Sequence, residues 1–289
     1  MTVTNAFRAT LDQIVAAVGD LPAAPAVMSS AMKLTSNTES KIADISKVLS
    51  SDQSISAKAM KLANSPFYGR KRQVKTLEEA ILVLGFDEVR SIIMAASAQK
   101  MFASDDPDGP ESKLWRHSFG TAVAARQIAR WLGHPDEGEV YVAGLLHDIG
   151  KLVLLQNLKD RYMEVVTQVE AETGSFRILE QQALHFNHCD VASMLLSKWS
   201  FPSDLVQALT SHHRPPTFRA GTTAPIAHVV SLASDISKHL DVGFADERID
   251  PLFRHPSAII LNLGHEATEE LLLETYTIYH SEMSLFESP

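Results

Sequence analysis

The stretch "AGLLHDIGKLVLLQ", residues 143–156, is mostly apolar but carries the ionisable side chains of His147, Asp148 and Lys151 at its centre. Its apolar spacing predicts one buried helix over residues 139–156. In such a helix His147 and Lys151 share a face, and Asp148 is turned away by about 100°. A buried carboxylate needs a partner. We therefore expect either an Asp148–Lys151 ion pair beside a hydrogen-bonded His147, or a divalent transition metal bound through nitrogen and oxygen.

Helical spacing extends along nearly the whole chain, and strict two-residue alternation is scarce, so the predicted fold is all-α. In "TLEEAILVLG", residues 76–85, Thr76 and Glu79 form a capping-box pattern, and Gly85 is typical of a helix end. The acidic loop "ASDDPDGPES", residues 103–112, indicates a boundary. We expect a two-lobed helical bundle, with one lobe over residues 1–105 and a second over residues 106–289.

The composition excludes several classes of protein. Lysine and arginine number 26 against 35 acidic residues, a net charge of −9, which argues against a nucleic-acid-binding protein. The hydrophobic content of 45% supports a substantial core. A single cysteine, Cys189, excludes an internal disulfide and favours the reducing cytoplasm. No apolar run reaches the roughly 18 residues of a membrane span, so we expect no membrane association.

Further histidines and one aspartate lie within or beside other apolar helices. Each one alone is typical of an ordinary core or surface residue. Together with the central pair they form an ordered series, and this series favours a shared metal site over coincidence. The members of the series outside the central pair are His117, His188, His212, His213 and Asp235.

The order His … His-Asp … Asp, with "HDIGK" at its centre, resembles the HD superfamily of metal-dependent phosphohydrolases. The chain is more specifically similar to the HDOD branch, the HD-related output domain of bacterial signalling proteins. This resemblance spans about residues 21–215. It is carried by "LPAAPAVMSSAMKL", "LANSPFYG", "TLEEAILVLGFDEVRSII", "LWRHSFGTAVAARQIA", "AGLLHDIGKLVLL" and "HCDVASMLLSKWSFP…HH".

The resemblance implies an HD-like second lobe and a set of metal ligands. Four residues match the core HD ligands, namely His117, His147, Asp148 and Asp235. Three more match the additional histidines of the related HD-GYP cyclic-dinucleotide phosphodiesterases, namely His188, His212 and His213.

The resemblance also implies a cofactor and catalytic roles. The cofactor would be one or two divalent transition-metal ions, Fe or Mn first, with Zn, Co or Ni as alternatives. Asp148 would bridge two metals. In metal-assisted hydrolysis of a phosphodiester, Lys151 would neutralise the charge that develops on the phosphate.

The chain departs from the HD-GYP enzymes at two places. Lys113 stands where they can supply a metal-binding glutamate, and "RPPTFRAG", residues 214–221, replaces their "ExxDGxGYP" loop. We therefore expect a regulatory module that acts through signalling-protein partners. The alternative is an active phosphohydrolase that binds a nucleotide or a cyclic dinucleotide. A di-iron oxygenase is a third class, without a substrate motif to support it. The oligomeric state stays open.

Three remaining residues receive structural interpretations. His185 is expected at a helix end, and Cys189 as a small buried thiol. His228 lies seven residues before Asp235, on the same helical face, where it could support the ligands from behind.

Overall fold

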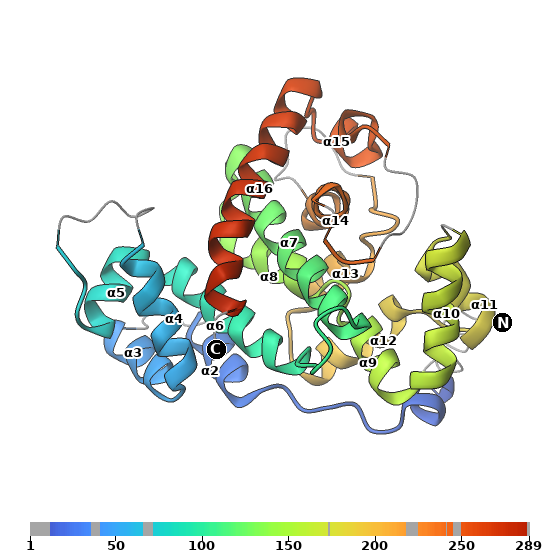
Figure 1. Cartoon of the computed structure of the whole chain (residues 1–289), viewed down its shortest axis with the longest axis horizontal. Coiled ribbons are helices and arrows are strands. Elements are labelled where there is room, and N and C mark those ends of the chain that lie inside the picture. Colours follow the sequence, from blue (N-terminus) through green and yellow to red (C-terminus); the bar gives the residue numbers. More distant parts are fainter. Residues whose placement is uncertain are drawn as a thin grey trace.

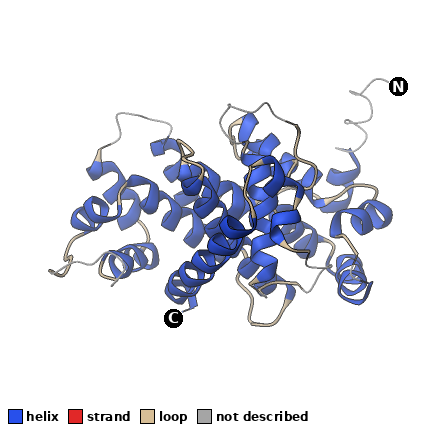
Figure 2. Ribbon diagram, turned by 90° about the horizontal axis from the view of Figure 1, so that it is seen from above, coloured by secondary structure: helices blue, strands red, loops and turns tan. Residues whose placement is uncertain are grey.

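The computed structural model describes residues 12–35, 41–65, 72–172, 174–217, 225–240, 242–244 and 250–287. The regular structure in these ranges is helical and includes no strand, which confirms the predicted all-α fold (Figure 2). None of the described helices combines the length and the apolar character that a bilayer crossing requires.

The first group of helices lies at the left of Figure 1 and includes α5, which begins and ends where the sequence predicts. The Thr76 hydroxyl accepts a hydrogen bond from the Glu79 backbone N–H, and Gly85 ends the helix with φ of 82°. Helix α6 packs against α2, α4 and α5. In chain order the helices of this group are α2 (Ala26–Thr35), α3 (Ile42–Ser50), α4 (Gln53–Ala63), α5 (Leu77–Leu84) and α6 (Phe86–Met101).

The second group is built around α7, which contacts α8, α14 and α16. Small residues let these helices approach α7 closely: a Cβ atom at Gly120 would lie 2.5 Å from the Ser237 Oγ of α14. The elements of this group are α7 (Pro110–Trp131), α8 (Glu137–Leu146), α9 (Ile149–Asn157), α10 (Lys159–Glu172), α11 (Phe176–Leu184), α12 (His188–Lys198), α13 (Ser203–Thr210), α14 (Ile226–His239), η2 (Leu252–Arg254), α15 (Pro256–Ile260) and α16 (His265–Glu287).

The prediction of one continuous helix over residues 139–156 is wrong. Helix α8 ends at Leu146, α9 begins at Ile149, and His147 and Asp148 form a turn between them. Asp148 has left the helical conformation, with φ of −104° and ψ of 11°. The side chains of His147 and Asp148 are therefore not held about 100° apart, as they would be on one continuous helix.

The two groups of helices share a continuous core. Buried apolar side chains of the first group, such as Leu49 and Ile93, belong to the same cluster as Leu209 of the second. Arg126 of α7 is buried between Glu88 of α6 and Glu282 of α16, with which it forms ion pairs. Such a pair holds helices together because leaving one partner buried alone costs several kcal/mol.

The segment before α2 lies against the second group of helices. The Lys198 Nζ donates to the Leu21 carbonyl at 2.6 Å, and the Trp199 indole donates to the Pro22 carbonyl at 2.9 Å. Figure 1 shows this blue segment passing beneath the second group. A lobe boundary near residue 105 stays a prediction.

Candidate metal centre

The turn between α8 and α9 lies deep in the second group because glycines flank it. A Cβ atom at Gly144 would lie 2.8 Å from the Ala122 Cα of α7, and one at Gly150 would lie 2.0 Å from the His188 carbonyl oxygen of α12. The absence of a side chain therefore lets α8 rest on α7 and α9 rest on α12. This packing brings the histidines of α7 and α12 toward Asp148.

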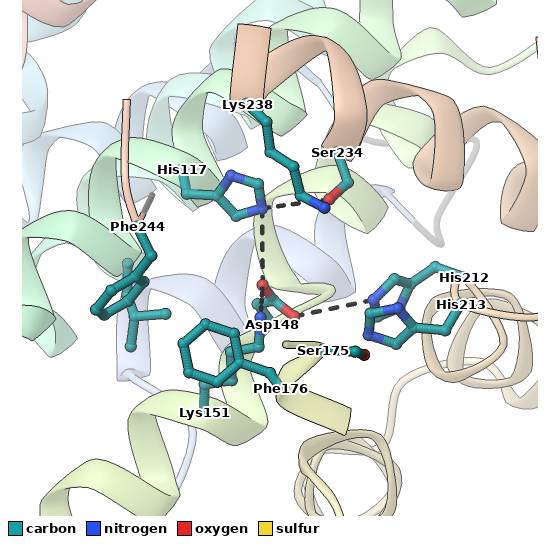
Figure 3. A pocket seen from close by; sticks show the side chains of 11 residues that line it. His117, Asp148, Lys151, Ser175, Phe176, His212, His213, Ser234, Lys238 and Phe244 are labelled. Atoms are coloured by element: carbon teal, nitrogen blue, oxygen red, sulfur yellow. Dashed lines mark hydrogen bonds and ion pairs between the residues drawn. The ribbon is translucent and has the colours of Figure 1, made fainter. Parts of the chain in front are cut away.

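Asp148 is the centre of the cluster and is 1% exposed. Its Oδ2 lies 2.8 Å from the Lys151 Nζ, 3.2 Å from the His147 Nε2 and 3.7 Å from the His117 Nε2. Figure 3 shows His117 and Lys151 converging on this carboxylate from different elements. The ion pair with Lys151 that the sequence suggests is thus present, and it is part of a larger cluster.

The second carboxylate oxygen faces the remaining histidines. Asp148 Oδ1 lies 3.4 Å from the His188 Nε2 and 3.9 Å from the His212 Nε2. The Nε2 atoms of His188 and His213 are 3.0 Å apart. His213 lies at the edge of the cluster, and this residue is exposed to solvent. Six of the seven ligands that the resemblance implies therefore lie together.

Three of the rings are fixed in orientation through their Nδ1 atoms. His147 Nδ1 bonds to the Gly144 carbonyl at 2.7 Å, and His212 Nδ1 bonds to the Leu209 carbonyl at 2.6 Å. His188 Nδ1 bonds to a carboxylate oxygen of Glu180 at 2.6 Å. Each Nε2 is thereby directed at Asp148. Metal-binding histidines are held in this manner, with the second ring nitrogen donating to a carbonyl or a carboxylate.

Two buried atoms of the cluster have no hydrogen-bond partner among the described residues, the Nε2 of His147 and the Oδ1 of Asp148. Buried polar groups are normally paired, so a buried imidazole nitrogen and a buried carboxylate oxygen that both lack a hydrogen bond favour a cation between them. The ligand atoms form two groups, each with its members within 4.8 Å of one another: His117, His147 and Asp148, and His188, Cys189, His212 and His213. Nitrogen and oxygen donors, with one thiol sulfur in the second group, fit a divalent transition metal.

The protonation states favour metal binding by three of these residues. Burial, together with the nearby His147, holds the pKa of His117 and of His212 well below the ordinary value, so both rings are neutral at pH 7. Burial alone would raise the pKa of Asp148, but His147 and Lys151 outweigh it and hold the pKa well below the ordinary value. Neutral imidazoles and an ionised carboxylate are the forms that bind metals.

His188 differs from the other rings. Burial lowers its pKa, but the neighbouring Cys189 and Glu180 outweigh burial and raise the pKa to about 10. Binding a metal at this ring therefore releases a proton from Nε2.

The structure does not bring Asp235 to the cluster. Its carboxylate lies 3.3 Å from the Lys238 Nζ and 3.5 Å from the His255 Nε2. The preceding residue, Ser234, faces the cluster instead, with its Oγ 3.3 Å from the His117 Nε2 (Figure 3). Adjacent residues on a helix point about 100° apart, so a displacement by one position turns the aspartate away. We leave Asp235 out of the proposed ligand set.

A cavity of about 90 Å³ opens beside Asp148. The Lys151 Nζ lies at its wall, 4.3 Å from the centre of the Phe176 ring. Lys238 and the ring of Phe244 line the same space (Figure 3). The cavity therefore combines two ammonium groups with aromatic walls, a chemistry that suits a small anion.

Glu180 is 0% exposed and lies beside the cluster, although none of the sequence motifs indicates it. A signal for it exists, because Phe176, Glu180 and Leu184 form the buried stripe of α11 at four-residue spacing. A glutamate in such a stripe is a buried charge that needs partners.

The remaining residues that the sequence singles out lie outside the cluster or at its edge. His185 ends α11 in the left-handed conformation, with φ of 67°, and Cys189 is buried, both as expected. His228 does not support the ligands, because its ring bonds to the Ser257 hydroxyl and the Pro216 carbonyl. Lys113, at the position of the missing glutamate, forms an ion pair with Glu170.

The family model of the HDOD domain matches residues 21–215, which is most of the chain. The chain belongs to the HDOD family. The match agrees with the span of the sequence resemblance.

Solved structures from three bacteria have the same fold as this chain. An HDOD domain protein of unknown function from Geobacter sulfurreducens is 24% identical, with a TM-score of 0.82 and 98% of each chain covered. A candidate signal transduction protein from Marinobacter aquaeolei VT8 is 23% identical, with a TM-score of 0.75 over 96% of this chain and 65% of that one. A candidate phosphohydrolase from Shewanella amazonensis SB2B is 20% identical, with a TM-score of 0.70 over 94% and 96%.

An uncharacterized protein of Treponema pallidum (strain Nichols) is 22% identical over 228 residues, or 78% of this chain. The HDOD chain spans 43% of the length of that relative.

Proposed function

We propose that this HDOD chain is a regulatory module of bacterial signalling that holds one or two divalent transition-metal ions around Asp148. The observation that carries the proposal is the convergence of four Nε2 atoms on one buried carboxylate, each within 3.9 Å of it. Without a cation, the four rings would crowd around one ionised carboxylate whose Oδ1 has no hydrogen-bond partner among the described residues. A metal would satisfy the rings and the carboxylate together.

The donor set favours Fe or Mn, with Zn, Co or Ni as alternatives, because imidazole and carboxylate ligands suit all of them. When bound, such a metal supplies Lewis acidity toward water or a phosphate oxygen. Ligands from α7, the α8–α9 turn, α12 and the residues after α13 would be cross-linked by such a metal. In a regulatory module this cross-link would fix the surface that protein partners recognise.

Two observations support regulation over hydrolysis. The chain after His213 lacks the "ExxDGxGYP" loop of the HD-GYP enzymes, and the cavity beside Asp148 measures about 90 Å³. Pockets for larger organic ligands usually measure about 300–1,000 Å³, so this cavity is small for a cyclic dinucleotide. The name of the Marinobacter relative, a candidate signal transduction protein, agrees with this choice.

Phosphohydrolase activity is the second candidate. It is supported by the side chains of Lys151 and Lys238 beside the cluster, which could bind the phosphate of a nucleotide. The name of the Shewanella relative agrees with this alternative.

Elemental analysis of the chain purified without chelators, together with assays on a panel of phosphodiester and phosphomonoester substrates, decides between the two candidates. We expect about one or two metal ions per chain and no hydrolysis. Metal with turnover would support the phosphohydrolase. A chain that holds no metal, and takes up none from Mn²⁺ or Fe²⁺, would end the proposal.

Replacing Lys151 by glutamine is expected to leave the metal bound and to weaken the binding of inorganic phosphate about 10- to 150-fold. The reason is that a charge-assisted hydrogen bond contributes about 1.5–3 kcal/mol. Calorimetric titration with phosphate measures the change. Lys100→Gln is the matched control, since the Lys100 ammonium pairs with Asp52 in the first group of helices. Equal phosphate affinity in Lys151→Gln and the native chain would remove Lys151 from the anion site.

A further inference from the structure

A chain of buried hydrogen bonds leads away from the metal cluster through His188. Glu180 Oε2 accepts from the His188 Nδ1 at 2.6 Å and from the His188 backbone N–H at 2.8 Å. Glu180 Oε1 accepts from the Tyr162 hydroxyl at 2.6 Å. Glu180 and His188 are 0% exposed, and Tyr162 is 1% exposed. The three side chains come from α11, α12 and α10.

This arrangement distinguishes His188 from the other fixed rings. His147 and His212 bond to backbone carbonyls, whereas His188 bonds to a charged carboxylate. A carboxylate behind a histidine holds the ring in one tautomer and makes the opposite nitrogen a stronger donor to a metal. The burial of Glu180 is tolerated because three donors satisfy its two oxygens.

We propose that Glu180 is a positioning residue of the metal centre, which acts through His188 and is held in place by Tyr162. The inference rests on the proposed metal site and assigns a role to a residue outside it. Glu180 sets the direction and the donor strength of the His188 Nε2, which lies 3.4 Å from Asp148 Oδ1. Loss of its charge weakens metal binding while the fold is kept.

Titration of the metal-free chain with Co²⁺, followed by visible absorption, tests this role. Glu180→Gln keeps the shape and an acceptor oxygen but loses the charge. We expect it to bind Co²⁺ about 10–100-fold more weakly, the usual effect of losing an outer partner of a metal-binding histidine. The absorption bands of bound Co²⁺ should also shift, because the His188 ring is no longer fixed. Circular dichroism and melting in chelator check that the metal-free fold is retained.

A second buried glutamate provides the matched control. Glu282 is paired with Arg126, away from the cluster, so Glu282→Gln disturbs a buried ion pair without touching a ligand. We expect this variant to melt at a lower temperature and to bind Co²⁺ like the native chain. An equal loss of Co²⁺ affinity in both variants would show that Glu180 acts through general stability, and it would overturn the proposal.

Tyr162→Phe covers the case in which Glu180→Gln fails to fold. It removes one hydroxyl and leaves the carboxylate, and we expect Co²⁺ binding to weaken about threefold, roughly the worth of one modest hydrogen bond. The proposal would be contradicted if Tyr162→Phe bound Co²⁺ with unchanged affinity while Glu180→Gln either failed to fold or also bound Co²⁺ unchanged. A native chain that binds no Co²⁺ would reject the metal site itself. Native binding with unaltered affinity in Glu180→Gln would reject the role of Glu180 alone.

Discussion

Asp148→Ala is expected to purify without metal and to lose about 3–5 kcal/mol of its free energy of unfolding, the usual cost of removing one partner from a buried ionic group. The Lys151 ammonium, 2.8 Å from the carboxylate in the native chain, would remain buried after its partner is gone. The histidine rings whose Nε2 atoms face Asp148 would lose the carboxylate that binds the metal together with them. Elemental analysis and thermal melting measure both effects, and we expect the melting temperature to fall by roughly 10 °C.

Asp235→Ala is the natural control, because the family pattern assigns a ligand to both positions. In the structure the Asp235 carboxylate faces Lys238 and His255 outside the cluster. We expect the Asp235 variant to retain its metal and to be destabilised by less than about 1 kcal/mol, as for a partly exposed ion pair. If this variant lost its metal as completely as Asp148→Ala, our placement of Asp235 outside the ligand set would be wrong.

Gly150→Ala is expected to lower the free energy of unfolding by about 3 kcal/mol, the upper range for overpacking a core. The added methyl group would lie 2.0 Å from the His188 carbonyl oxygen and 3.0 Å from the Ala192 backbone nitrogen. Both atoms belong to the backbone of α12, so α9 and α12 must separate. Metal retention should fall with stability, since His188 moves with α12. Urea denaturation and elemental analysis of the variant measure these changes.

Gly264→Ala separates this steric effect from the general consequence of replacing a glycine. A Cβ atom at Gly264 would meet no atom within 4 Å. We expect a loss of less than about 1 kcal/mol, because Gly264 immediately precedes α16 as its N-cap and alanine is a somewhat poorer N-cap than glycine. A Gly150→Ala chain as stable as Gly264→Ala would show that the close contact between α9 and α12 does not define the site.

The helical fold and several helix ends could be predicted from the sequence because local chemistry decides them. The Thr76 hydroxyl caps the start of α5, and Gly85 ends the helix because glycine readily adopts a positive φ. The break at His147 and Asp148 could not be predicted in this way. Leucines before the break, and isoleucine, lysine and leucines after it, favour a continuous helix, and the break depends on the contacts that Gly144 and Gly150 make with distant helices.

The site shows the same division between local and distant causes. The ordered motifs predict His117, the central pair and the later histidines, which the structure brings together. The resemblance assigns a ligand role to Asp235, whereas Ser234 is the residue that faces His117, because the packing of α14 on α7 determines which residue points toward the cluster. Glu180 is recognisable as a buried residue from its helical stripe, but its pairing with His188 depends on how α11 meets α12.

Diffraction from crystals of the metal-loaded chain, recorded at the absorption edge of the bound metal, tests the central claim most directly. Our account predicts an anomalous peak between the Asp148 carboxylate and the surrounding Nε2 atoms, at metal–ligand distances of about 2.0–2.2 Å. A second peak on the other side of the carboxylate would indicate a dinuclear centre. A metal-free cluster, or an anomalous peak at a site that Asp148 does not reach, would contradict the account.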